Sequence, residues 1–279
     1  MRRSTLLVTA TLIRDTFREA LARWVFWGLF GVSTLLILFF WFIMRIDLVQ
    51  GASATISLFG YTSPVTGDVA KLVRGVHGGV ASFFYTIAMF LAVFASAVLI
   101  PTVLETGRIE LLLSKPVARW HILLGRYLGN LLVVTLNTCY LIVAVWLIFG
   151  WKTGFWNSTF LYAILTTTFM FAVLLSAIVL VSVLTESAAV ATMVTFGMMI
   201  LSPILAQHRI MVKLLSSEWS RSLWKGLYYA LPKFFDVGRI HMELVMGRPL
   251  DSLAPVWSST AFAVVMLAAA IFAFSKRNY

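Results

Sequence analysis

The chain has 279 residues, of which 61% are hydrophobic and 12% are charged. Globular proteins average about 45–50% apolar and about 25% charged residues, so the composition excludes a soluble enzyme, a disordered protein and a disulfide scaffold. The net charge is +11. In a membrane protein, basic residues hold loops in the cytoplasm and meet anionic lipid, so we expect a lipid membrane as a partner and no nucleic acid.

Residues 1–23 are expected to form an amphipathic helix that lies in the membrane interface. Arg14 and Asp15 interrupt the apolar run too early for a cleaved signal. A plain cytosolic lead-in to the first span is the alternative. The apolar residues recur at spacings of three and four: Leu6, Ala10, Ile13, Phe17, Ala20 and Trp24.

Six stretches without Asp, Glu, Lys or Arg have the length of about 20 apolar residues that a membrane helix needs. The stretch 48–67 is also uncharged, but it is rich in Gly, Ser and Thr and contains Pro64, so we expect a loop there. The sequence therefore predicts an all-α integral membrane protein, one transmembrane domain over residues 1–279. We place its helices near 24–44, 82–104, 128–149, 159–184, 187–206 and 257–274.

The distribution of Lys and Arg predicts the orientation. The short loops carry most basic residues on one side if both termini are cytoplasmic. Counting the basic residues of 207–256 removes this excess, but long loops translocate with weaker regard to charge. We expect a multi-pass protein of the cell (inner) membrane, with cytoplasmic N- and C-termini and an extracytoplasmic segment 207–256.

Segment 207–256 is the least lipid-like part of the chain. Trp224, Tyr228 and Leu231 fall on one helical face, and Pro232 ends the helix. This face is a candidate contact for an extracytoplasmic partner protein or a gate. A helix lying on the outer leaflet and a re-entrant hairpin are the alternatives.

Motifs for catalysis and for resident cofactors are absent from the sequence. There is no Walker A pattern, no His-Glu-x-x-His and no Gly-x-Ser-x-Gly. The four histidines are scattered and Cys139 is the one cysteine, so we expect no metal site. The six predicted spans carry no ionisable pair, and we expect neither catalytic residues nor a cofactor bound by this chain.

Segment 105–126 is the cytoplasmic loop between the second and third predicted spans. Glu105 and Arg108 are spaced to pair on a short helix, whose apolar side carries Leu112 and Leu113. Ser114 can cap a second helix. Such an apolar knob with flanking charges suits docking to a soluble partner. The alternative is a lipid-surface hairpin held by Lys115, Arg119 and Arg126.

The sequence of this loop resembles a known family. Glu105-Thr-Gly-Arg-Ile-Glu-Leu-Leu-Leu-Ser-Lys-Pro-Val-Ala-Arg-Trp, followed by Leu124-Gly-Arg-Tyr-Leu-Gly129, is similar to the loop after the second span of ABC-2-type transporter permeases. Arg14-Asp-Thr-Phe-Arg-Glu-Ala20 and Tyr228-Tyr-Ala-Leu-Pro-Lys-Phe-Phe-Asp236 resemble the branch associated with multicopper-enzyme maturation.

The resemblance implies a six-helix half-transporter that pairs with a second copy or a homologous permease. Two separate ABC ATPase subunits would bind the ATP and Mg. The turn Thr185-Glu186-Ser187 would be a smaller ATPase contact. A non-transporting scaffold and an intramembrane enzyme are the alternatives. The coupling contact implied for the loop comprises Glu105, Thr106, Gly107, Arg108, Ile109, Glu110, Leu112, Leu113, Lys115 and Pro116.

Overall fold

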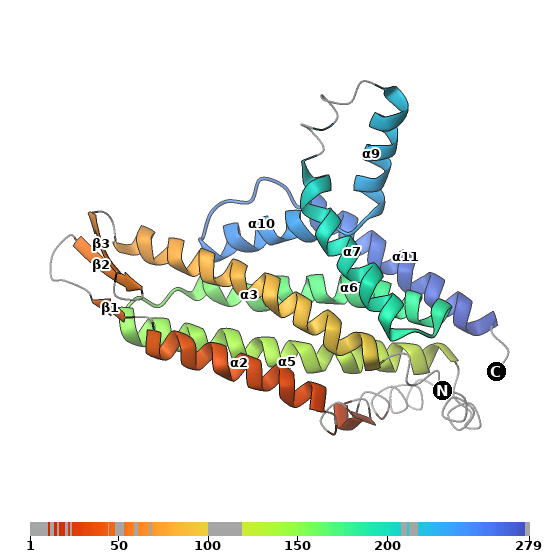
Figure 1. Ribbon diagram of the computed structural model, residues 1–279, viewed down its shortest axis with the longest axis horizontal. Coiled ribbons are helices and arrows are strands. Elements are labelled where there is room, and N and C mark those ends of the chain that lie inside the picture. Colours follow the sequence, from red (N-terminus) through yellow and green to blue (C-terminus); the bar gives the residue numbers. More distant parts are fainter. Residues whose placement is uncertain are drawn as a thin grey trace.

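Six long helices form a single bundle in the part of the chain that the computed structural model describes (Figure 1). This part comprises residues 24–43, 45–47, 53–58, 61–66, 69–99, 119–207 and 217–276, with Met211 and isolated residues between 11 and 22. The long helices are α2 (Trp24–Ile43), α3 (Val69–Leu99), α5 (Arg119–Thr153), α6 (Tyr162–Thr185), α7 (Ala188–Ala206) and α11 (Ala254–Lys276).

Shorter elements join these helices. A 3-10 helix, η2 (Ser158–Leu161), precedes α6, and two short helices, α9 (Glu218–Ala230) and α10 (Phe234–Val245), lie between α7 and α11. Three strands follow α2: β1 (Arg45–Asp47), β2 (Ser53–Leu58) and β3 (Tyr61–Thr66). They form an antiparallel sheet in the order β1-β2-β3.

The helices give the bundle two distinct ends. At the first, α3 ends, α5 begins, α6 turns into α7 and α11 ends; we call it the loop end. At the opposite sheet end, α2 runs into the β-sheet and α5 into η2. Ser96 of α3 donates a hydrogen bond of 3.1 Å to Asn130 of α5 near the loop end. The described helix ends that flank the predicted cytoplasmic segments therefore lie at one end of the bundle.

The bundle has the surface of a membrane protein. Five helices are long and apolar enough to cross a bilayer, and α2 contributes a shorter apolar stretch, Phe26–Phe42. Amphipathic aromatic rings concentrate at membrane–water interfaces. Exposed rings accordingly gather at the loop end on Trp24, Trp27 and Trp120, and at the sheet end on Trp41, Trp151, Trp156 and Tyr162.

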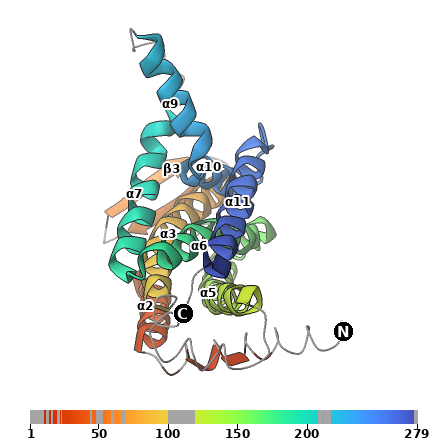
Figure 2. The same ribbon diagram turned by 90° about the vertical axis from the view of Figure 1, so that its right-hand side faces the viewer.

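Helix α6 is the centre of the bundle. Its apolar residues are distributed all around the helix, as expected for a helix with neighbours on most sides and lipid on the remainder. It packs against α3, α5, α7 and α11, which surround it when the bundle is viewed from the loop end (Figure 2). Phe171, Leu174 and Ile178 are completely buried there.

Two helix boundaries differ from those expected. Helix α3 begins at Val69 rather than near residue 82, and α5 begins at Arg119 rather than near residue 128. The expected boundaries followed the uncharged stretches, whereas a helix continues beyond the apolar core wherever water or protein satisfies its charged residues. Arg74, Arg119 and Arg126 are therefore helical.

The expectation of a loop over 48–67 was wrong, because β2 and β3 lie within it. The Thr, Ile and Val residues of these segments favour strands. Pro64 is tolerated because β3 is an edge strand of the sheet. Gly and Pro suggested irregular structure, but here they occur beside or on an edge strand.

Replacing a buried leucine of α6 tests the central position of this helix. Leu174→Ala should lower the free energy of unfolding by about 2–3 kcal/mol, because it leaves a cavity where every neighbour was in contact. The measurement is reversible unfolding in mixed micelles. Leu165→Ala on the same helix is the matched control: Leu165 is 65% exposed, so a change within about 0.5 kcal/mol is expected. Equal effects would contradict the assigned core.

Candidate functional site

The residues implied as the ATPase contact lie outside the described residues. This applies to Glu105, Thr106, Gly107, Arg108, Ile109, Glu110, Leu112, Leu113, Lys115 and Pro116. The structure does describe the helices that flank the segment, α3 up to Leu99 and α5 from Arg119. The coupling role of the segment therefore stays a prediction, and the structure describes only the helices on either side of it.

The first turns of α5 are fastened to two other parts of the chain. Nη1 of Arg119 donates hydrogen bonds to the carbonyl oxygens of Phe274 and Ser275, at 3.5 and 3.3 Å. These carbonyls end α11, where a helix lacks internal donors and a basic side chain is favourable. Arg126 forms an ion pair with Glu19, and both side chains are only 16% exposed. Arg119 and Arg126 thus bind protein atoms, whereas the lipid-surface hairpin of the alternative, with Lys115, lies outside the described residues.

The predicted smaller contact, Thr185-Glu186-Ser187, forms the turn between α6 and α7. Glu186 has φ 54°, a left-handed conformation that ends α6, and its side chain is exposed. Ser187 caps α7 by accepting a hydrogen bond of 3.4 Å from the amide of Val190. The turn lies at the loop end, as do the ends of α3 and α11.

Helix α9 carries the predicted outer contact face. It projects from the bundle in both views and contacts α7 (Figures 1 and 2). None of its residues is buried, although Trp224 and Tyr228 are partly covered; Leu231, which was predicted on the same helical face, instead has an extended backbone directly after the helix. Leu223 and Leu227 are 45% and 43% exposed. An amphipathic helix is therefore present where it was predicted, with much of its apolar face uncovered by the described chain.

The break between α9 and α10 is held by three hydroxyl groups. The amide of Lys233 donates to Oγ of Ser259 at 3.2 Å, and the amide of Phe235 donates to Oγ of Ser202 at 2.9 Å. The hydroxyl of Tyr85 donates to the carbonyl of Phe234 at 3.0 Å. The first amides of a helix have no internal acceptor, so side chains of α11 and α7 satisfy those of α10.

Two charged residues are buried beside this break. The Lys233 ammonium donates to the carbonyl of Tyr228 and lies over the ring of that tyrosine. The Tyr228 hydroxyl donates to Oδ2 of Asp236 at 3.0 Å. Burial lowers the pKa of Lys233 to about 8, against the opposing effect of Asp236. Burial, and then the Asp236 carboxylate, raise the pKa of Tyr228 to about 12.

His241 adds a buried polar contact on α10. Its Nδ1 shares a hydrogen bond of 2.6 Å with Oγ1 of Thr166 on α6. The side chain is completely buried, and burial lowers its pKa from 6.5 to about 4. His241 is therefore neutral at physiological pH, and it joins α10 to the central helix.

The sequence prediction missed most of the polar residues that surround the break between α9 and α10. It identified Tyr228, but not Lys233, Asp236 or His241, nor the serines of α7 and α11. The segment Pro232-Lys-Phe-Phe-Asp236 carried the available signal, because opposite charges that flank two aromatic residues after a helix-ending proline indicate a packed turn.

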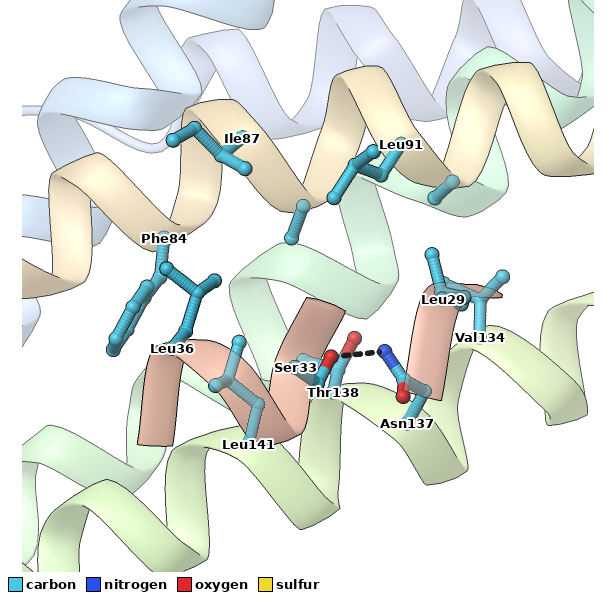
Figure 3. Close-up of a pocket in the computed structure, with 12 residues that line it drawn as sticks. Leu29, Ser33, Leu36, Phe84, Ile87, Leu91, Val134, Asn137, Thr138 and Leu141 are labelled. Atoms are coloured by element: carbon cyan, nitrogen blue, oxygen red, sulfur yellow. Dashed lines mark hydrogen bonds between the residues drawn. The ribbon is translucent and has the colours of Figure 1, made fainter. Parts of the chain in front are cut away.

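A second polar feature lies between α2, α3 and α5. Nδ2 of Asn137 donates to Oγ of Ser33 at 3.0 Å beside a cavity of about 10 Å³ (Figure 3). Oγ1 of Thr34 and the hydroxyl of Tyr140 also share a hydrogen bond, of 3.2 Å. A cavity of this size holds about one water molecule, so it is too small to form an open path for a substrate. The two hydrogen bonds join α2 to α5.

Comparison with known proteins agrees with this architecture. The model of the family described as ABC-2 family transporter protein matches residues 10–279. The chain belongs to this family. No curated protein matches the chain.

Membership of the ABC-2 family makes the protein a membrane permease of the ABC transporter class, a transport component rather than a catalytic one. It confirms the predicted family and the all-α membrane fold. The match concerns the family as a whole, so the branch associated with multicopper-enzyme maturation stays a prediction.

Removing a serine that holds the α9–α10 break should destabilise the permease. Ser259→Ala leaves the Lys233 amide buried without an acceptor, which costs about 1–3 kcal/mol. The thermal midpoint in detergent should fall, and backbone hydrogen exchange at residues 233–235 should accelerate. Ser258→Ala is the matched control and should leave both unchanged. Unaltered exchange in Ser259→Ala would contradict the assigned bond.

The buried His241 predicts a loss of stability in acid. Its folded-state pKa lies below the unfolded value, so the unfolded chain takes up the proton first. Its contribution is fully present above pH 6.5 and is lost as the pH falls towards 4, by about 3 kcal/mol for a shift of this size. Unfolding midpoints across this window should depend less on pH in His241→Phe.

Thr166→Val is the control for His241→Phe. It removes the same hydrogen bond but retains the titrating imidazole, so its midpoint should be lower at every pH while the acid slope remains. An identical slope in His241→Phe and wild type would show that another group causes the acid sensitivity.

Proposed function

We propose that this chain is the membrane-spanning subunit of an ATP-driven transporter whose ATPase is a separate protein. The family match over residues 10–279 carries the proposal. The sequence contains no Walker A pattern, so ATP and Mg would bind in the partner. A second copy, or a homologous permease, would complete the transporter.

Segment 105–116 would dock on the ATPase and transmit its motion. The described helices support this role, because the segment leads into α5, and Arg119 ties α5 to the end of α11. Movement of the segment would therefore displace two spans together. The exposed turn at Glu186 lies at the same end and would give α6 and α7 a second, smaller contact.

The proposed orientation places the loop end in the cytoplasm of a cell whose inner membrane holds the protein. The sheet would then face the extracytoplasmic side, and segment 207–256 would belong to the same side, with α10 inserted along α3 into the outer leaflet. On that side Trp224, Tyr228 and Leu231 would contact a partner protein or form part of a gate. The excess of basic residues in the short loops of the loop end supports this orientation.

Two other functions make different predictions. An intramembrane enzyme needs a nucleophile and base that substrate can reach. Thr166 and His241 are close enough to pair, but His241 is completely buried. A non-transporting scaffold would assemble without coupled ATP hydrolysis. Measuring ATP hydrolysis by the complex in lipid separates both from a transporter.

Glu105→Ala tests the coupling contact. Removing one partner of a desolvated charge pair at an interface costs about 2–5 kcal/mol, whereas a solvent-exposed pair contributes about 0–1 kcal/mol. We expect the variant to insert normally and to lose at least about tenfold in ATPase retention or in ATP hydrolysis by the complex in lipid vesicles, equivalent to about 1.4 kcal/mol. Leu112→Asp should have the same effect.

Glu218→Ala is the matched control. Glu218 is exposed on α9, which lies away from the loop end, so retention and hydrolysis should remain at wild-type levels. Wild-type behaviour of both Glu105→Ala and Leu112→Asp would exclude segment 105–116 as the coupling element. An ATPase that co-purifies with the chain but hydrolyses no ATP in lipid would favour the scaffold.

A further inference from the structure

Two cavities lie along one side of the seam between α3 and α10. The first, of about 350 Å³, is lined by Arg74, Gly75, Met246, Gly247, Arg248 and Pro249. The second, of about 270 Å³, is lined mainly by Ser82, Tyr85, Thr86, Phe235, Arg239 and Met242. Both use residues of the same two helices, α3 and α10, or the chain directly after α10.

Helical spacing shows that the two cavities are in line. On α3, Gly75, Ser82 and Thr86 recur at intervals of seven and four, so they share one face. On α10, Met242 and Met246 are one turn apart. The interval from Arg74 to Thr86 corresponds to about 18 Å along the helix axis. Between the cavities Met246 packs against Gly78, where an added Cβ would lie 2.3 Å from its Cε.

The outer cavity is cationic. Arg74 of α3 and Arg248, which follows α10, both line it, and both residues are exposed. Among the described residues that line either cavity, none is acidic. The guanidinium of Arg74 also lies 5.8 Å from the ring centre of Phe155, which holds it at the sheet end.

The inner cavity is lined largely by apolar side chains, apart from Arg239. Phe235 is 48% exposed, so this side of the seam is part of the outer surface of the bundle. Nε of Arg239 lies 4.0 Å from Oε1 of Glu243, and the Arg239 side chain is 61% exposed. Oγ of Ser82 lies buried in this wall and has no hydrogen-bond partner among the described residues.

The depths of the two cavities match the layers of a bilayer. Arg74 is the last charged residue before the uncharged stretch of α3 that begins at Gly75, whereas Ser82 and Thr86 lie two to three turns further along the helix. The cationic cavity is therefore at headgroup level and the apolar cavity is within the hydrocarbon. Two arginine side chains suit the phosphate of an anionic lipid headgroup, because a guanidinium can donate two parallel hydrogen bonds to phosphate oxygens.

The geometry points to a binding site for an anionic phospholipid along the α3–α10 groove. Arg74 and Arg248 bind its phosphate, and one acyl chain lies beside Ser82, Phe235 and Met242. The lipid enters from the leaflet at the sheet end, because the groove opens to the surface of the bundle. It holds α10 against α3, next to the break fixed by Ser202 and Ser259. The site requires a membrane-embedded bundle but not the proposed coupling to an ATPase.

The test measures lipid binding to the purified, delipidated chain in an uncharged detergent by native mass spectrometry. Phosphatidylglycerol should bind one molecule per chain more tightly than phosphatidylcholine. The variant Arg74→Gln/Arg248→Gln should weaken that binding at least about tenfold, and Ser82→Trp, which fills the inner cavity, should weaken it similarly. If Ser82→Trp does not fold, Ser82→Met replaces it.

Two controls distinguish this site from general charge attraction and from a contact with the headgroup alone. Arg221→Gln/Lys225→Gln removes two charges from α9 outside the groove and should leave binding intact; equal weakening would reduce the effect to general surface charge and overturn the site. Glycerol phosphate, which lacks acyl chains, should not compete at the same concentration. Equal competition, equal binding of phosphatidylcholine, or no effect of filling the inner cavity would likewise overturn the proposal.

Discussion

A helix that begins inside a protein needs acceptors for its first amides, and this requirement organises the structure around α10. Buried amides are out of reach of bulk water, so they must be satisfied by other parts of the chain. Ser259 and Ser202 accept the hydrogen bonds, and Tyr85 donates to the neighbouring carbonyl. Three helices therefore meet at one turn, and Lys233 and Asp236 are enclosed with it. The position of α10 fixes one wall of the groove along α3 and the direction in which α9 leaves the bundle.

The transmembrane helices were predictable because the bilayer imposes a length and a polarity on each of them. Uncharged stretches accordingly identified the ranges that became α2, α6, α7 and α11. The same criterion misplaced the beginning of α3, since Lys71 and Arg74 are helical beyond the apolar layer. It also overlooked the β-sheet, in which β2 alternates Ser and Thr with Ala, Ile and Leu. Backbone pairing between β2 and β3 satisfies their hydrogen bonds without an apolar run.

The polar contacts could not be predicted in the same way, because they join residues that are distant in sequence. Nothing near Ser202 or Ser259 indicates that each meets the start of α10, and the partner of His241 is a threonine in another helix. The prediction for segment 105–116 rested instead on a local pattern. What the structure adds is the attachment beyond it: Arg119 and Arg126 join α5 to α11 and to Glu19. These contacts hold the beginning of α5, the helix that follows the segment, against the rest of the bundle.

The packing of α11 along α6 has a consequence for biogenesis. Helix α11 covers the central helix α6 and also supplies the hydroxyl that accepts the hydrogen bond from the Lys233 amide. Because α11 follows α6 by about 70 residues, the ribosome must synthesise α11 before the core can close. Until then, the nascent protein holds an incomplete α6 surface in the bilayer, where lipid tails or an insertase must shield it. Quality control that senses this intermediate would distinguish chains that contain α11 from chains that end before it.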